Sequence, residues 1–301
     1  MKTSVLLGNG INRCVLKDIC CSDMLSQIAK KYNVELNKNI SFPMQFETLV
    51  TQILLKYSDC PDDIYIKLKE EIIALLKEGD MLPENSPHKA LTDNSDSIIT
   101  TNYDFFIEKS IDPDFDETAI PVYSKDSNNK YNLKNSISVF GKKVYHIHGD
   151  VRRAQSICLG YEHYAGTLQH LRDAIKTRKK GDEEDAPAIV LKLRHEESQS
   201  DVWAEKIFTD NIHIVGFGLS KAEIDIWWLI TYRASLFYSN RFNCRNLITN
   251  QITYHDIGVK PDENMRFTLE NLGVKYAFHE IPEITNEHYW KEYIKIPEMI
   301  K

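Results

Sequence analysis

The sequence lacks the features that place a protein in a membrane or draw it to nucleic acid. No apolar run approaches the ~18 residues that span a bilayer. The N-terminus breaks into Gly-Asn-Gly without a small-residue cleavage site, so we expect no signal peptide. Lys and Arg number 37 against 44 Asp and Glu, a net charge of −7. This balance argues against direct nucleic-acid binding and against binding to an anionic membrane.

Cysteine is sparse. The six cysteines are scattered along 301 residues, and no Cys-x-x-Cys pair occurs. A four-cysteine zinc site is therefore not expected, and neither is a disulfide scaffold at this length. We predict free thiols in a reducing cytoplasm and no bound metal. A hydrophobic fraction of 42% is ordinary for a globular protein and argues against disorder over most of the chain.

Short apolar segments alternate with helical patterns along the chain. The predicted strands cover residues 1–7, 98–101, 144–147, 212–215, 247–249 and 276–278. Helical patterns cover about 22–79, 162–177, 222–238 and 263–272. This alternation predicts an α/β fold with an open parallel sheet covered by helices. In such sheets ligands bind in the crevice at the carboxyl ends of the strands.

Polar and glycine-rich segments follow four of the predicted strands. They are Gly8-Asn9-Gly10-Ile11-Asn12-Arg13, Thr101-Asn102-Tyr103-Asp104, His146-Ile147-His148-Gly149-Asp150 and Gly216-Phe217-Gly218-Leu219-Ser220. Because the carboxyl ends of parallel strands meet at one edge, we expect the four segments to converge. The first has the features of a phosphate cradle, in which glycine allows close approach and a following helix presents free N–H groups. The alternative is a tight strand-to-helix turn.

The first glycine segment does not complete the dinucleotide-binding fingerprint of a dehydrogenase. Arg13 stands where the third glycine of Gly-x-Gly-x-x-Gly belongs. No acidic residue ends a second strand ~20 residues further on. A plain hydride-transfer enzyme therefore fits poorly.

Three side chains after the central strands have the chemistry of an active site. A neutral His148 is able to accept a proton from a hydroxyl or from water. His146 points to the opposite face of the same strand, so one of the two is expected to be structural, and position alone does not say which. Asn102 is able to hold a water or a ribose hydroxyl, and Asp104 is able to accept from an amide. The alternative for the Asn and Asp is capping of the next helix.

The four segments occur in the order of sirtuin motifs, and the chain resembles the sirtuin-like domains of bacterial antiphage defence systems. The motifs extend from residue 1 to about 240. The resemblance implies a Rossmann-like sheet that binds NAD between the sheet and a helical module. We expect one domain over 1–301, with the helical module at about 18–95 and a second helical insertion at about 160–205.

The resemblance also assigns roles to single residues. It implies that Asn102 holds the water and the nicotinamide ribose and that His148 is the general base. Asp104 would bind the nicotinamide carboxamide, and Thr101 would contribute to the cofactor site. The remaining cofactor-binding residues would be Gly8, Gly10, Asn12 and Arg13 near the pyrophosphate and adjoining ribose, and Gly216, Gly218 and Ser220 on the adenosine side.

Two departures from the family bear on the reaction. Protein-deacylating sirtuins carry a four-cysteine zinc module after the His-Gly motif, but Cys158 is the one cysteine between Gly149 and Gly216. The Gln that precedes Asn in the deacylase pattern is Thr101 here. Both departures favour cleavage of NAD with water as the acceptor.

The predicted function is an NAD⁺ glycohydrolase that releases nicotinamide and ADP-ribose. NAD would be its substrate, and the resemblance implies an NAD-depleting effector of antiphage defence (abortive infection). Such an enzyme would harm its own cell if it were always active, so we expect a homo-oligomer or a partner defence protein to control it. The alternatives are a non-catalytic sensor of NAD or ADP-ribose and an NAD-dependent protein deacylase.

Overall fold

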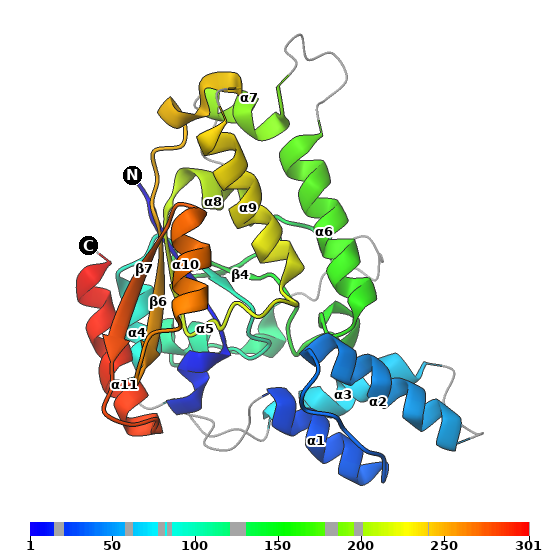
Figure 1. The fold of residues 1–301 in the computed structure, drawn as a ribbon. Helices are drawn as coiled ribbons and strands as arrows, with labels where there is room; N and C mark the ends of the chain where they lie inside the picture. Colours follow the sequence, from blue (N-terminus) through cyan, green and yellow to red (C-terminus); the bar gives the residue numbers. More distant parts are fainter. Residues whose placement is uncertain are drawn as a thin grey trace.

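The fold is built on a single sheet. The computed structural model describes residues 1–14, 21–57, 63–77, 82, 86–120, 131–177, 186–195, 201–239 and 241–300. Within them, the strands are β1 (Thr3–Leu7), β2 (Ser97–Thr100), β3 (Ile137–Val139), β4 (Lys142–His146), β5 (Asn211–Val215), β6 (Ile252–Gly258) and β7 (Val274–Glu280). Their order is β3-β4-β2-β1-β5-β6-β7, and every neighbouring pair is parallel except β3 and β4 (Figure 1). The predicted Rossmann-like α/β fold is confirmed.

The strand order creates a switch point beside β1. The chain moves outward from β1 to β2 and then β4, and it returns to the other side of β1 to form β5, β6 and β7. Leu7 pairs with Thr100 of β2 and with Val215 of β5, so the three strands end level with one another. Ligands of open α/β sheets bind at such a point, outside the carboxyl ends of the strands. The polar segments begin immediately after these residues.

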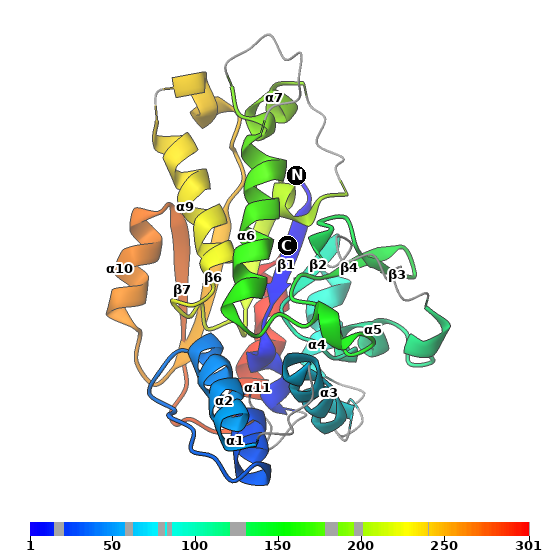
Figure 2. The ribbon, with the colours of Figure 1, turned by 90° about the vertical axis from the view of Figure 1, so that its right-hand side faces the viewer.

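Helices cover both faces of the sheet, as in Figure 2. On one face Leu6 packs with α6 (Tyr161–Lys176), α7 (Ala188–Arg194), α8 (Lys206–Thr209), α9 (Ile224–Tyr238) and α10 (Glu263–Asn271). On the other face Val5 and Leu7 pack with α4 (Pro87–Asp93), α5 (Phe106–Ile111) and α11 (Asn286–Lys295). All four residues of β2 are buried, because both faces of this strand are covered. Its sequence therefore shows no alternation of apolar and exposed polar residues.

A separate core joins the first three helices to the loops after β2 and β4. The helices are α1 (Cys21–Lys31), α2 (Phe42–Lys56) and α3 (Ile64–Lys77). Leu25, Leu49 and Leu68, one from each helix, are fully buried in a cluster that includes Tyr103 and Leu159. The three helices lie at the carboxyl ends of the strands (Figure 1). We call α1–α3 the helical module; α4, which the prediction placed in the same module, packs on the sheet.

Some predictions of secondary structure were wrong. Leu247 is in a turn after a 3₁₀ segment, Arg241–Asn246, residues 248–249 are irregular, and the strand begins only at Ile252. Ile248 is buried by tertiary packing, and this accounts for the apolar signal. The hairpin of β3 and β4 was not predicted either. Its turn residues Phe140 and Gly141 both have positive φ, which suits a tight two-residue hairpin.

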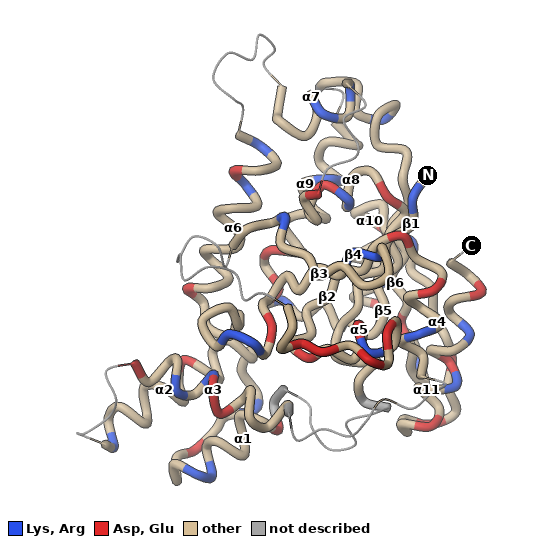
Figure 3. Tube along the Cα trace, turned by 180° about the vertical axis from the view of Figure 1, so that it is seen from behind, with Lys and Arg blue, Asp and Glu red and all other residues tan. Residues whose placement is uncertain are grey.

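Along the described part of the chain, charges of the two signs are not separated into two poles. Lys and Arg are interspersed with Asp and Glu along the described trace (Figure 3). A ligand would therefore depend on contacts inside a cavity more than on long-range attraction. Among the described residues, no helix has the length and apolar character to cross a bilayer.

Candidate active site

A cavity of about 490 Å³ lies at the switch point. This volume is within the range of small-molecule sites, roughly 300–1,000 Å³. Its lining comes from all four polar segments, from the helical module and from two further side chains. The lining residues are Asn9, Gly10, Met24, Phe42, Gln45, Leu76, Thr101, Asn102, Tyr103, Asp104, His148, Tyr164, Gly216, Phe217, Gly218, Leu219, Ser220 and Glu223.

Most of the predicted site residues meet in this cavity. Those that line it are Gly10, Thr101, Asn102, Asp104, His148, Gly216, Gly218 and Ser220. Gly8 and Asn12 are not among the lining residues. Arg13 belongs to the 3₁₀ segment Asn9–Cys14, but its side chain lies outside the described residues.

His148 is held by a buried carboxylate. Its ring is 3% exposed, and its Nε2–H donates to Oδ2 of Asp225 at 2.9 Å. Asp225 is fully buried in the first turn of α9, where its Oδ1 also accepts from the N–H of Ile226. Because Nε2 is engaged in this way, Nδ1 is the nitrogen left for a substrate or a water.

The surroundings of His148 favour its charged form. Burial lowers the pKa of His148, but the Asp225 carboxylate, its hydrogen bond and nearby Glu223 outweigh burial and raise the pKa above its usual value. Glu223 Oε2 lies 3.9 Å from His148 Nε2 and accepts from the hydroxyl of Tyr164 at 3.2 Å. Burial also raises the pKa of Glu223. The carboxylates that face the ring therefore set the direction of the pKa shift of His148.

The same three side chains have the donor set of a cation site. Ligand atoms of His148, Glu223 and Asp225 all lie within 4.8 Å of one another. A divalent cation would fit this set of one imidazole and two carboxylates. Such an ion would replace the hydrogen bond between His148 and Asp225, so a metal and an acid–base role exclude each other here.

Asn102 carries an acceptor without a partner. Its side chain is 4% exposed, and its Nδ2 donates a long hydrogen bond of 3.4 Å to the carbonyl of Gly8. Its Oδ1 is buried and has no hydrogen bond within the described residues. A buried unsatisfied acceptor costs about 1–3 kcal/mol. This atom is therefore suited to receive a hydroxyl or a water in the cavity.

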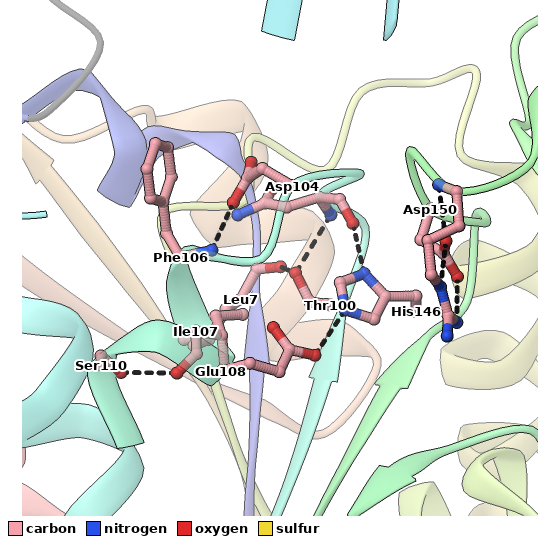
Figure 4. Close-up of polar contacts among 11 residues, drawn as sticks. Leu7, Thr100, Asp104, Phe106, Ile107, Glu108, Ser110, His146 and Asp150 are labelled. Carbon is pink, nitrogen blue, oxygen red and sulfur yellow. Dashed lines mark hydrogen bonds and ion pairs between the residues drawn. The ribbon is translucent and has the colours of Figure 1, made fainter. Parts of the chain in front are cut away.

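His146 anchors the turn that carries Asn102. Its Nδ1–H donates to the carbonyl of Asn102 and its Nε2–H to Oε1 of Glu108, both at 2.8 Å (Figure 4). Burial lowers the pKa of His146, but the charge and hydrogen bond of Glu108, with Asp150 and the Asn102 carbonyl, prevail and raise it to about 9. A protonated ring supplies both donors. The two histidines of the third segment therefore differ in position: His148 lines the cavity, and His146 does not.

Asn12 positions Asp104. Its Nδ2 donates to Oδ2 of Asp104 at 2.6 Å and to Oδ1 of Asn9 at 3.2 Å. Its Oδ1 accepts from Nε2 of His88, whose pKa burial lowers to about 3, so His88 is neutral. The amide of Asn12 therefore pairs with three neighbouring side chains, and Asn12 does not line the cavity. Burial raises the pKa of Asp104.

The first glycine segment packs against the fourth. Gly10 donates its N–H to the carbonyl of Gly216 at 2.7 Å. A 3₁₀ segment, Asn9–Cys14, begins within the first glycine segment. The Gly10 N–H is therefore not free for an anion, and close contact between two loops explains the glycine. A Cβ on Gly10 would lie 2.6 Å from the Gly216 oxygen.

We predict that Gly10→Ala destabilises the fold by about 1–3 kcal/mol, because two backbones must separate. Gly218→Ala is the matched control in the same cavity, since a Cβ there meets nothing within 4 Å. Its effect should stay within about 0.5 kcal/mol. Urea unfolding of both variants measures the difference. Equal stability of the two would contradict the close approach.

Sequence reasoning missed several residues of the site. Glu223 and Asp225 read as ordinary acidic residues at a helix start, where carboxylates are common. Tyr164 lies on α6, and its ring packs edge-on against His148 at 5.4 Å. Gln45 belongs to the helical module. No spacing in the sequence joins these positions to His148, because tertiary packing alone brings them together.

The segment that carries three of the four motifs matches a known protein family. Residues 96–228 match the SIR2-like domain family. SIR2-like domains are commonly NAD-dependent enzymes, so the match indicates a function related to NAD. It includes Asn102, His148 and Asp225, and it leaves the first glycine segment outside. Together with the parallel sheet it supports a sirtuin-like fold. The chain has no significant match among curated proteins.

Proposed function

We propose that the chain is an NAD⁺ glycohydrolase, which cleaves NAD⁺ with water to nicotinamide and ADP-ribose. The observation that carries the proposal is the joint presence of Asn102 and His148 in one cavity at the switch point of the sheet. The SIR2-like match supports NAD as the ligand. We place Asp104 at the carboxamide, and Thr101, Gly216, Gly218 and Ser220 along the dinucleotide.

The reaction breaks the bond between C1′ of ribose and the nicotinamide nitrogen. Nicotinamide leaves as a neutral molecule from a cationic ring, so no strong acid has to protonate it. The main task of the protein is to hold the two ends of NAD⁺ and a water at C1′. Oδ1 of Asn102 accepts from that water or from a ribose hydroxyl.

His148 is the base in this scheme. Its Nδ1 takes a proton from the water or from a ribose hydroxyl, which contributes roughly 10²–10⁴-fold to the rate. Asp225 is a positioning residue, because its carboxylate fixes the Nε2–H tautomer and stabilises the imidazolium that forms. Glu223 and Tyr164 complete the wall around the ring.

The pH dependence of turnover tests the role of Asp225. The base must be neutral, so kcat/KM should rise with pH through the raised pKa of His148. Asp225→Asn removes the charge that raises this pKa, and the acid limb should move to lower pH. Glu223→Gln, at 3.9 Å from the ring, should shift it less. An acid limb that stays in place in Asp225→Asn would contradict the assignment.

The direct test is incubation of purified chain with NAD⁺ and measurement of free nicotinamide by chromatography. We expect nicotinamide and ADP-ribose in equal amounts, with no requirement for an acyl-lysine peptide. Binding of NAD⁺ without products, with and without candidate partner proteins, would instead support a sensor. Consumption of NAD⁺ only in the presence of an acylated peptide would support a deacylase.

The cellular role that we propose is regulated depletion of NAD in antiphage defence. Its support is the resemblance of the four motifs to sirtuin-like defence domains. Control by a homo-oligomer or by a partner defence protein is part of the proposal, because unregulated NAD⁺ hydrolysis is toxic. Measuring cellular NAD after phage infection, in cells with the wild-type chain or with a His148 variant, tests this role.

A further inference from the structure

The helical module contributes an unusual wall to the cavity. Its lining residues are Met24 of α1, Phe42 and Gln45 of α2, and Leu76 of α3. Gln45 is the one polar side chain among these four, and it is 5% exposed. Apolar surface with a single oriented polar group is typical of a site for a flat heterocycle.

The orientation of the Gln45 amide follows from its contacts. Its Nε2 donates to the carbonyl of Ile40 at 2.9 Å. A carbonyl accepts only, so the amide nitrogen must face Ile40, and Oε1 must face away from it. Oε1 is buried and accepts no hydrogen bond within the described residues. Leaving such an acceptor unsatisfied is costly, and a ligand that donates an N–H would remove that cost.

Of the buried polar atoms without a partner in the described chain, those of Gln45 and Asn102 belong to residues that line this cavity. One comes from the helical module and the other from the sheet. A dinucleotide that spans the cavity would satisfy both. NAD⁺ carries two heterocycles with an amino donor, namely the exocyclic amine of adenine and the carboxamide of nicotinamide.

We propose that Gln45 is a specificity-determining residue that reads the exocyclic amine of adenine in the bound dinucleotide, since the nicotinamide carboxamide is assigned to Asp104. The inference rests on the proposed function for the identity of the ligand. Gln45 acts in binding and leaves the chemical step to Asn102 and His148. Apolar contacts from Phe42 and Leu76 support the ring, and Oε1 accepts from its amino group.

Two analogues of NAD⁺ separate the amino group read by Gln45 from the one assigned to Asp104. Nicotinamide hypoxanthine dinucleotide has an oxygen in place of the adenine amine, and nicotinic acid adenine dinucleotide has a carboxylate in place of the carboxamide. The first change turns the donor to Oε1 into an acceptor, and the second removes the donor assigned to Asp104. Calorimetric titration in a His148→Gln background measures binding of all three dinucleotides without turnover.

We expect nicotinamide hypoxanthine dinucleotide to bind about ten- to a hundredfold more weakly than NAD⁺, because a buried acceptor loses its donor. Gln45→Met should bring this ratio close to one, chiefly by weakening NAD⁺. Gln52→Met is the matched control on the same helix. Its amide is satisfied by the main chain of Glu35, and Gln52 does not line the cavity, so the ratio should be kept.

The inference is overturned if nicotinamide hypoxanthine dinucleotide binds as tightly as NAD⁺, if the ratio of these two affinities persists in Gln45→Met, or if NAD⁺ does not bind. Failure of the proposed function looks different. Wild-type chain that binds NAD⁺ with this discrimination and releases no nicotinamide would contradict hydrolysis and leave the role of Gln45 standing. Turnover of NAD⁺ without discrimination against the hypoxanthine analogue would support hydrolysis and contradict the role of Gln45.

Discussion

His148→Gln should lower nicotinamide release by about 10²–10⁴-fold, the contribution of a positioned base. Glutamine is the informative replacement because its amide N–H is able to donate to Asp225, so the buried carboxylate keeps a partner. Alanine would leave that charge unpaired and confuse loss of catalysis with loss of stability. The affinity for NAD⁺ should change little, since His148 acts at the bond that breaks and does not bind either end of the dinucleotide.

The control for this variant is His195→Gln, an exposed histidine just after α7. It should release nicotinamide at the wild-type rate. Single-turnover assays with chromatographic detection of nicotinamide, together with calorimetric binding of NAD⁺, separate the chemical step from affinity. Full turnover by His148→Gln would remove the base from the mechanism.

Near neutral pH, Glu108→Gln should lower the free energy of unfolding more than any other substitution proposed for this chain. The side chain of Glu108 is fully buried and that of His146 is 4% exposed. Loss of one charge from a buried pair costs about 3–5 kcal/mol. Asp104, Asp150 and Arg152 are the other charged groups near His146. We expect a loss of about 3 kcal/mol at pH 6 for Glu108→Gln, where His146 stays protonated.

The loss should depend on pH in a defined direction. The pKa of His146 is about 9 in the fold and about 6.5 when unfolded. Its contribution is therefore complete below about pH 6.5 and disappears as pH rises through about 9. The difference between wild type and Glu108→Gln in the free energy of unfolding should shrink between pH 6 and 9.5.

Urea unfolding across this pH range measures the effect. Glu117→Gln is the control, because Glu117 pairs with Lys109 at 3.6 Å in a partly exposed ion pair that is worth less than about 1 kcal/mol. It should show neither the large loss nor the trend with pH. A difference for Glu108→Gln that stays constant from pH 6 to 9.5 would contradict a charged His146.

The positions of the central strands and the meeting point of the motifs were predictable from sequence for a physical reason. Parallel strands covered on both faces are continuous apolar runs, and their carboxyl ends share one edge. Asn102 and His148 both follow such runs directly. The rule that brings strand ends together therefore placed them in one region without any knowledge of side-chain contacts.

The partners of these residues were not predictable in the same way. Asp225 lies 77 residues from His148 along the chain, and Asn12 lies 92 residues from Asp104. Each contact depends on how a helix start or a turn is oriented after the sheet has formed. Position along the strand likewise did not choose between the two histidines. The resemblance assigned His148, and the contact of His146 with Glu108 on α5 explains the different surroundings of His146.

The most direct test of the account is a crystal structure of His148→Gln with NAD⁺ bound. The account predicts C1′ of the nicotinamide ribose between the side chains of Asn102 and residue 148, with both heterocycles inside the cavity at the carboxyl ends of the strands. NAD⁺ bound on another surface, or bound with C1′ remote from these two side chains, would contradict it.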